Sequence, residues 1–176
     1  MFVIRTASSG DVPAILRLLQ EAGLRGEGVD KHPDSFWVLE EIGNPPRIAG
    51  TLGMEVYGRT GLLRSFVVER ERWNPQVGVR FFLLALSAAR ERGIDELYLA
   101  APGFLPFFEA IGFTEVEEGQ LPEPIRKSSH LRRAAGSGEA RLMRCRLHRV
   151  FDAREEAPSL RRNPEGRGNS AGGCGQ

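Results

Sequence analysis

The chain has 176 residues, of which 24 are Lys or Arg, 23 are Asp or Glu, and 41% are hydrophobic. These values fit one soluble globular domain better than two. Its two cysteines, Cys145 and Cys174, belong to no Cys-x-x-Cys or Cys/His cluster, which excludes a disulfide framework and a metal-ligand spacing. The chain has no run of about 18 apolar residues, and its N-terminus begins like a strand. We therefore expect a cytoplasmic protein with reduced thiols, neither membrane-spanning nor secreted.

The N-terminal segment predicts a strand followed by a helix. Residues 2–7 alternate apolar and polar side chains, which is typical of a strand. A polar string at 8–11 then precedes apolar residues at helical spacing, with Pro13 in the first turn and Gly23 after the last. We predict a helix over about 11–22.

The next part of the chain predicts a loop and an antiparallel meander. Residues 25–34 are polar and contain glycine, so we expect a loop that can close over a site. Turn signals at 44–46 and 58–61 then separate three runs with strand character. The predicted strands are 36–41, 48–57 and 62–69.

Residues 76–92 carry the strongest helix signal in the chain. Apolar side chains recur at helical spacing and the pattern ends at Gly93. A short apolar strand follows at 96–101. A strand, a helix and a strand in sequence imply a right-handed crossover, which predicts parallel pairing of 62–69 with 96–101.

The remaining elements alternate helix and strand up to a change in composition. We predict helices over 105–111 and 122–133, and strands over 113–117 and 140–147. Cys145 alternates with apolar neighbours, so we interpret it as a core residue. The three histidines have no telling partner in the sequence, and we interpret them as surface residues: His32, His130 and His148.

The C-terminal part of the chain is basic and then polar. Residues 126–149 contain eight Lys or Arg and one acid, Glu139. No aromatic residues interleave with these charges, so a solvated face or attraction of an anionic ligand is favoured over nucleic-acid binding. From 149 onward few apolar residues remain, which predicts a disordered tail over 149–176 after a single domain over 1–148.

A carboxylate and a guanidinium are predicted to meet in the hairpin of strands 48–57 and 62–69. A short turn gives residue pairs whose numbers sum to 119, so Glu55 would face Arg64, with Tyr57 on the face of Glu55 and Ser65 pointing away. In this register Arg64 shares a face with Leu62, Phe66 and Val68. One interpretation is an ion pair across the sheet. The other is functional: Glu55 removes a proton from a substrate ammonium, directly or through water, while Arg64 binds an anionic group.

The turn at 72–78 lies between a predicted strand and the N-terminus of the strongest helix. The first backbone N–H groups of a helix are unpaired and carry the positive end of its dipole, so such a turn can bind an anion. Every strand-to-helix turn shares this property, and the turn alone does not identify a ligand.

Several strings, in their order and spacing, resemble the GNAT superfamily of acetyl-coenzyme-A-dependent N-acetyltransferases over residues 2–147. They are Ile-Arg at 4–5 with Ser-Gly-Asp at 9–11, Ala-Gly-Thr-Leu-Gly at 49–53, Leu-Arg-Ser-Phe-Val-Val at 63–68, Ala-Arg-Glu-Arg-Gly at 89–93, and Phe-Phe-Glu-Ala-Ile-Gly-Phe at 107–113. Segments 53–58, 62–65 and 124–126 resemble the branch associated with arsenic-resistance operons. The implied fold is α/β (α+β), with a mixed, mostly antiparallel sheet, a splayed parallel pair in its middle and helices on both faces.

The resemblance implies a site for acetyl-coenzyme A and no metal. The pyrophosphate would lie on the turn 73–78, and the pantetheine arm between the splayed strands would pair with their free backbone groups. The backbone N–H of Val68 would meet the oxyanion that develops on the thioester carbonyl. The implied coenzyme-binding residues are Phe66, Val67, Val68, Trp73, Asn74, Gln76, Val77, Gly78, Val79 and Phe108.

Two features depart from the superfamily pattern. The turn usually reads Arg or Gln, two residues, Gly, one residue, then Gly or Ala, whereas these positions are Trp73, Gln76 and Gly78 here. Trp73 can stack on the adenine or pack against the end of the sheet. Phe108 stands where many members have a tyrosine that protonates the departing thiolate, and phenylalanine cannot donate a proton.

The sequence therefore predicts an N-acetyltransferase that transfers acetyl directly to a small primary amine or an amino-acid-like substrate. The substitutions in the turn support an alternative, a catalytically degenerate domain that binds coenzyme A, another ligand or a protein partner without turnover. A homodimer is left open, a membrane partner is not expected, and nucleic-acid binding is a distant third interpretation.

Overall fold

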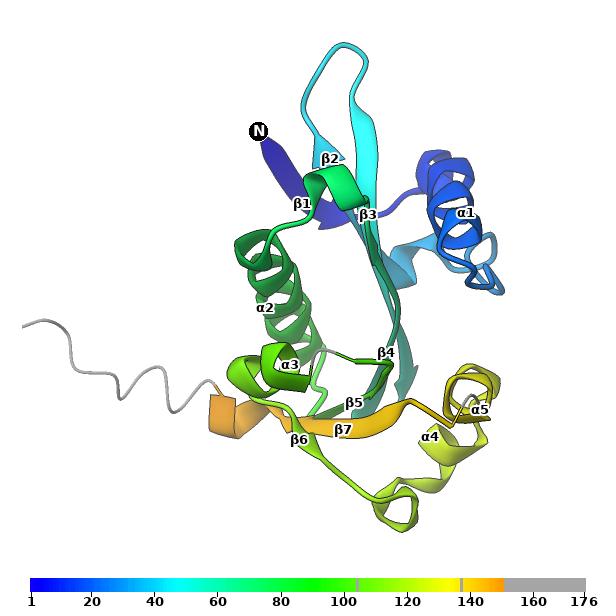
Figure 1. Cartoon of the computed structure of the whole chain (residues 1–176), viewed down its shortest axis with the longest axis vertical. Coiled ribbons are helices and arrows are strands. Elements are labelled where there is room, and N and C mark those ends of the chain that lie inside the picture. The colour runs from blue at the N-terminus through cyan, green and yellow to red at the C-terminus, as the bar shows by residue number, and fades with distance from the viewer. Residues whose placement is uncertain (104, 137, 151–176) are drawn as a thin grey trace, which may run out of the picture.

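A seven-stranded sheet with one parallel pair organises the molecule (Figure 1). The computed structural model describes residues 1–103, 105–136 and 138–150. The strands are β1 (Phe2–Thr6), β2 (Phe36–Glu41), β3 (Arg47–Tyr57), β4 (Thr60–Val68), β5 (Glu96–Ala101), β6 (Thr114–Glu115) and β7 (Arg141–Arg146). Their order is β1-β2-β3-β4-β5-β7-β6, and only β4 and β5 pair in parallel in the described part of the chain. The predicted mixed sheet is confirmed.

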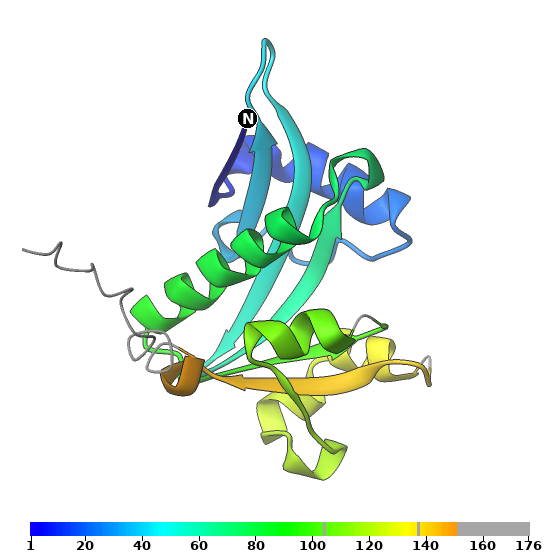
Figure 2. The same cartoon turned by 60° about the vertical axis from the view of Figure 1, so that its left-hand side comes forward.

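Helices cover both faces of this sheet (Figures 1 and 2). The long α2 (Pro75–Glu91) crosses one face, beside α3 (Leu105–Ile111). The other face carries α1 (Val12–Glu21) over the first strands, and α4 (Glu123–Lys127) with α5 (Ser129–Gly136) over the last ones. Short 3₁₀ turns lie between these elements, at Ser9–Asp11, Pro33–Ser35, Arg70–Arg72 and Glu118–Gln120.

The largest core lies between the sheet and α2. Phe81, Phe82 and Leu86 of α2 are buried against Leu97 and Met143 of the sheet. Each such side chain contributes about 1.5–3 kcal/mol through its removal from water. Two smaller cores lie on the opposite face, one under α1 and one under α4 and α5. This division leaves the middle of that face, between α1 and α5, to polar side chains.

The parallel pair separates soon after it forms. Its register is Thr60↔Glu96, Gly61↔Leu97 and Leu62↔Tyr98, and it ends there although both strands continue, to Val68 and Ala101. The predicted splay is therefore confirmed, and it begins at Leu62.

The hairpin register and a β-bulge at Ser65 correct two predictions about β4. Gly53 pairs with Arg64 and Thr51 with Val67, so two residues of β4 oppose one of β3, and Ser65 adopts a left-handed conformation with φ 58°. The hairpin turns at residues 58 and 59, with Tyr57 paired to Thr60, so the pair numbers sum to 117 up to the bulge and Glu55 faces Leu62 and not Arg64.

The bulge also shifts which face each side chain meets. Phe66 and Val68 pack with the core under α2, whereas Val67 packs with the core under α1. Leu62, which precedes the bulge, belongs to the core under α4 and α5. The expectation that Arg64 shares a face with Phe66 and Val68 is wrong, because the extra residue inverts the alternation.

The region predicted as one helix over 122–133 is two helices. The chain leaves the helical conformation at Ser128, where ψ is 128°, and α5 begins at the next residue. The predicted strand at 113–117 is shorter, Thr114–Glu115. Cys145 is buried as predicted, and its pKa is raised to about 12 by burial. The predicted disordered tail over 149–176 is wrong at its start, because residues 149 and 150 are helical and Val150 packs against the core; the rest of it and Cys174 lie outside the described residues.

Candidate functional site

A polar cluster forms around the carboxylate of Glu55. The guanidinium of Arg64 donates from Nη1 to Oε1 of Glu55 over 2.8 Å. The hydroxyls of Tyr57 and Ser128 both donate to Oε2, over 2.5 and 3.0 Å. Glu55 and Arg64 thus meet as predicted, but diagonally across β3 and β4 and not as a directly opposed pair. The cluster joins the β3–β4 hairpin to Ser128, which is 73 residues from Glu55 in the sequence.

The cluster lies where the parallel pair separates. Glu55 pairs with Leu62, and Leu62 with Tyr98 is the last pair between β4 and β5. Arg64 is two residues further along β4, within the splayed part. Any molecule bound between the two strands would therefore have this carboxylate at its inner end.

Arg64 is held on several sides and only 10% of its side chain is exposed. Its Nε donates to Ser65 Oγ and its Nη2 to the backbone oxygen of Glu27, over 3.2 and 2.8 Å. The guanidinium also lies 5.7 Å from the centre of the Phe36 ring. Ser65 contacts Arg64, contrary to the expectation that it points away. These contacts favour a structural role for Arg64 beside Glu55 over free capture of a substrate anion.

The environment of Glu55 keeps its carboxylate ionised. Burial raises the pKa of Glu55, but the hydrogen bonds from Tyr57, Arg64 and Ser128 together outweigh it, and the pKa lies below its usual value. Burial, and then the bond to Glu55, raise the pKa of Tyr57, which therefore keeps its proton. A carboxylate has about four lone-pair positions, and three are used here, which leaves one for a water molecule or a substrate.

A glycine-flanked loop covers this cluster. Glu27 lies between Gly26 and Gly28, and its carboxylate accepts two bonds of 2.7 Å from Arg133 of α5. Those bonds, the largest influence on it, lower the pKa of Glu27 to about 2. Because the backbone oxygen of Glu27 also binds Arg64, the loop connects α5 to β4 over the site. The predicted loop over 25–34 therefore lies next to the carboxylate of Glu55, through the contact of Glu27 with Arg64.

Two residues of this region were not identified from the sequence. Ser128 reaches Glu55 only because the predicted helix is interrupted there; the adjacent Ser129, which begins α5, was a signal for a second helix start. His130 is partly buried, and burial, followed by the charge of Arg64, lowers its pKa to about 4. Its imidazole is therefore neutral at pH 7. His32 and His148 are exposed, as predicted.

On the donor side, the backbone of β4 faces the splay. Glu69 N–H donates to the oxygen of Ala49, so Glu69 belongs to a hydrogen-bonded pair of the antiparallel ladder. Such pairs alternate with non-bonded ones, and Val68 stands opposite Gly50 in the next, non-bonded position. The N–H and C=O groups of Val68, and by the same alternation those of Phe66, therefore point away from β3 and toward β5. This arrangement suits the predicted role of Val68 as an oxyanion donor.

The start of α2 offers few free donors. Asn74 caps the helix, its Oδ1 accepting from the N–H of Val77 over 2.8 Å, and its backbone oxygen accepts from Gly78 over 3.1 Å. Pro75 has no N–H. Among the described residues of this turn, Gln76 has the one first-turn N–H outside these bonds.

Trp73 packs over the start of α2. Gly78 is required there, since a Cβ at this position would lie 2.6 Å from the indole ring and 3.1 Å from Phe107. The indole also meets Phe66 and Phe107 edge to face, with ring centres 6.0 and 5.9 Å apart. The structure shows this packing and leaves 41% of Trp73 exposed, and its stacking on an adenine stays a prediction.

The other residues predicted to bind the coenzyme lie in β4, α2 and α3. Phe108 is buried, with its ring 5.4 Å from that of Phe82 and 5.2 Å from that of Phe107. Val77 and Val79 are partly buried on α2, and Gln76 is exposed. Val67 faces α1, so its side chain lies on the face opposite that of Phe66.

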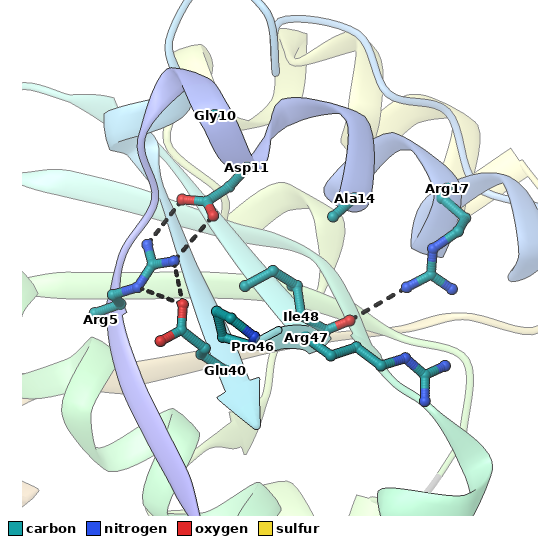
Figure 3. Close-up of a pocket in the computed structure, with 9 residues that line it drawn as sticks. All are labelled: Arg5, Gly10, Asp11, Ala14, Arg17, Glu40, Pro46, Arg47 and Ile48. Carbon is teal, nitrogen blue, oxygen red and sulfur yellow. Dashed lines mark hydrogen bonds and ion pairs between the residues drawn. The ribbon is translucent and has the colours of Figure 1, made fainter. Parts of the chain in front are cut away.

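A cavity of about 620 Å³ lies away from this site, between α1 and the β2–β3 hairpin (Figure 3). Its charged side chains all have partners: Arg5 binds Asp11 and Glu40, Arg17 binds the backbone oxygen of Ile48, and Arg47 binds Glu69 outside the cavity. These contacts stabilise the packing of α1 on the sheet, and none of the guanidinium groups in Figure 3 is left without a partner to face the open part of the cavity.

The described ranges contain neither a metal cluster nor a membrane-spanning helix. No group of three or more His, Cys, Asp or Glu side chains there could hold a metal ion. In the same residues, no helix is long and apolar enough to span a bilayer. Several cations of the basic segment 126–149 are in ion pairs, including Lys127 with Glu123 and Arg141 with Glu115.

No family model and no curated protein sequence matches the chain. Solved structures do match. N-acetylglutamate synthase from Neisseria gonorrhoeae, complexed with coenzyme A and N-acetyl-glutamate, has a TM-score of 0.70 at 25% identity over 84% of this chain. This chain spans 35% of the length of that enzyme.

Shorter proteins match over nearly their whole length. Rv2747 from Mycobacterium tuberculosis, in complex with CoA, has a TM-score of 0.68 at 19% identity, covering 82% of this chain and 98% of that one. An acetyltransferase of the GNAT family from Staphylococcus aureus Mu50 has a TM-score of 0.64 at 18% identity, covering 84% and 99%. The chain thus has the fold of the GNAT acetyltransferases.

Proposed function

We propose that the chain is an acetyl-coenzyme-A-dependent N-acetyltransferase that acts on a small primary amine or an amino-acid-like substrate by direct transfer. The observation that carries the proposal is the separation of β4 and β5 directly beyond Leu62, next to the ionised carboxylate of Glu55. The complexes of structural neighbours with coenzyme A support it.

The donor would lie in the splay. Amide groups of a pantetheine arm can pair with the N–H and C=O groups of Phe66 and Val68, as an added strand does. The N–H of Val68 would then bind the oxygen of the thioester carbonyl, which becomes negative during attack.

The acceptor would approach from the face that carries Glu55, between α1 and α5. Arg64 binds Glu55 and so marks the position of its carboxylate along β4, while Val68 marks the position of the reacting carbonyl. These two residues are four apart, so their Cα atoms are separated by about 13 Å in an extended strand, less the shortening by the bulge. An amine next to the carbonyl is therefore too far from Glu55 for direct contact, and we propose that its proton reaches Glu55 through water. The free lone pair of the carboxylate can accept that water.

The proposed acetyl transfer passes through no covalent enzyme intermediate. The amine nitrogen forms a bond to the acetyl carbon, the carbon–sulfur bond breaks, and the coenzyme leaves as a thiolate. The ammonium loses one proton through water to Glu55 before attack, and the nitrogen loses a second proton to solvent as the amide forms. The thiolate takes a proton from solvent, since Phe108 has none to donate. An amine acceptor needs this base because a free ammonium has a pKa near 10.

The alternative is a degenerate domain that binds coenzyme A, another ligand or a protein partner without turnover. Two observations support it: Asn74 already accepts a hydrogen bond from the N–H of Val77 at the start of α2, and Arg64 is already bound to Glu55 and Glu27. Membership of the arsenic-resistance branch, a cytoplasmic location and a homodimer stay predictions.

The test is titration calorimetry of the full chain with acetyl-coenzyme A, followed by thiol release with a panel of primary amines and amino acids. Saturable one-site binding with amine-dependent thiol release is expected. Binding without thiol release from any amine would favour the degenerate domain. No binding at millimolar ligand would refute the enzyme proposal.

A further inference from the structure

The start of α2 is poorly suited to hold a pyrophosphate. An anion at a helix start is held by several unpaired N–H groups together. Here Pro75 supplies none, the N–H of Val77 binds Asn74 Oδ1, and the N–H of Gly78 binds the backbone oxygen of Asn74. In the described first turn of the helix, Gln76 alone would donate.

Trp73 fills the space beside those groups. Its ring lies against Gly78, where a pyrophosphate would need to approach the backbone. Phe66 and Phe107 hold the ring from two further directions. Placing a doubly charged group against these three rings would remove its water without supplying hydrogen bonds, which is unfavourable.

The preceding segment adds no net positive charge. Residues 69–72 read Glu-Arg-Glu-Arg. Arg72 binds Glu41 over 3.0 Å, and the side chain of Glu69 accepts from Arg17 and Arg47. The next cation along the chain is Arg80, exposed on the second turn of α2.

The splay, in contrast, suits an uncharged ligand arm. The strand edge at Phe66 and Val68 presents neutral N–H and C=O groups, and Phe66 adds an apolar wall continuous with Phe82. Amides separated by short methylene chains, as in pantetheine, match both kinds of group.

We propose that the chain recognises its acyl donor through the thioester-bearing pantetheine arm, and that the nucleoside diphosphate part adds little to recognition. The proposal rests on the proposed function, because it names the donor class of that same site. Short acyl-pantetheine thioesters are then substrates nearly equivalent to acetyl-coenzyme A.

The experiment compares two ligands that share the arm and differ in the nucleotide. Dissociation constants of coenzyme A and of pantetheine are measured by titration calorimetry on the full chain. We expect a ratio below about tenfold, since each charge-assisted hydrogen bond to a pyrophosphate would alone contribute roughly ten- to a hundredfold. A larger ratio in favour of coenzyme A, or no binding of pantetheine at millimolar concentration, would overturn the proposal.

Variants give a second, independent measurement. Arg80→Ala should leave the coenzyme A affinity unchanged, and a loss above about tenfold would overturn the proposal by revealing a phosphate contact. Trp73→Ala with Pro75→Ala clears the ring and adds an N–H, and should tighten coenzyme A at least about threefold without tightening pantetheine. Equal changes for both ligands would count against the proposal. Leu84→Ala, on the exposed face of α2, is the matched control.

The two proposals fail differently. Equal binding of both ligands without turnover of any amine refutes the transferase and leaves the recognition of the arm intact. Turnover of acetyl-coenzyme A with none of acetyl-pantetheine refutes the recognition proposal and leaves the transferase intact.

Discussion

The two sides of the splay are built from different chemistry. On the acceptor side, Glu55, Tyr57, Arg64 and Ser128 form a closed set of charged and hydroxyl groups with short hydrogen bonds. On the donor side, aromatic rings from β4, α2 and α3 pack edge to face, and the polar groups that face the gap are backbone. Charge is thus concentrated on the side of the splay where the proposed transfer needs a proton acceptor, while the side proposed for the donor offers shape and neutral backbone groups.

The largest effect is expected on the donor side, from Phe82→Ala. The ring is buried and contacts those of Phe66, Phe107 and Phe108, with centres 4.7 to 5.8 Å away. Its removal should lower the free energy of unfolding by about 3–5 kcal/mol. Urea denaturation measures this, with Leu84→Ala on the exposed side of α2 as the control. A loss no larger than the control's would show that the rings contribute little.

On the acceptor side, Glu55→Gln should reduce kcat about 10²-fold through loss of the proton acceptor. Affinity for the donor should stay the same, because the donor lies in the splay. Steady-state kinetics and calorimetry measure the two effects, and the melting temperature monitors the charge left on Arg64. Full activity of this variant across pH would contradict the assignment of Glu55.

A smaller effect is expected from Ser128→Ala, which removes one of three hydrogen bonds to the Glu55 carboxylate. The bonds hold the pKa of Glu55 low, so activity that needs the ionised form is lost only as pH falls through that low pKa. In the variant the pKa rises, and the acid limb of kcat/KM should move to higher pH by up to about one unit. Ser129→Ala is the matched control, and an equal shift there would refute this account.

The smallest effect is expected from Arg133→Gln, which releases Glu27 at the surface. The thermal midpoint should not change, because exposed ion pairs contribute little. Hydrogen exchange of the backbone amides of Val29 and His32 in the covering loop should accelerate severalfold. Arg132→Gln, one residue away, should leave exchange unchanged. Equal exchange in both variants would show that the loop is held by other contacts.

Most of the fold follows from periodicity in the sequence. The helical spacing and the glycine at its end placed α2 within one residue of its observed ends, and β2 and α3 matched their predicted ranges. The parallel pairing of β4 with β5 followed from the strand–helix–strand order. These features depend on local patterns and on handedness, which a sequence carries directly.

The site was predicted less completely, for physical reasons. Glu55, Tyr57 and Arg64 were identified as neighbours, but their register was wrong because the turn lies at residues 58 and 59, one position earlier than a centre between 59 and 60. The bulge was missed because Ser65 lacks the glycine signature of a left-handed residue. Ser128 and His130 were missed because their contacts depend on how α4 and α5 pack over the sheet. Such tertiary contacts produce no periodic pattern in the sequence.

The bulge at Ser65 reverses the alternation of β4 side chains between the two faces of the sheet. Upstream of it, Arg64 addresses the acceptor face; downstream, Phe66 and Val68 face the donor side. Deleting this one residue would leave a regular strand in which Phe66 stands opposite Leu52, so Phe66 and Val68 would keep their face under α2 and Val67 its face under α1. Deletion scanning along β4 would thus find the chain most tolerant at Ser65, because there the loss of one residue restores regular pairing with β3.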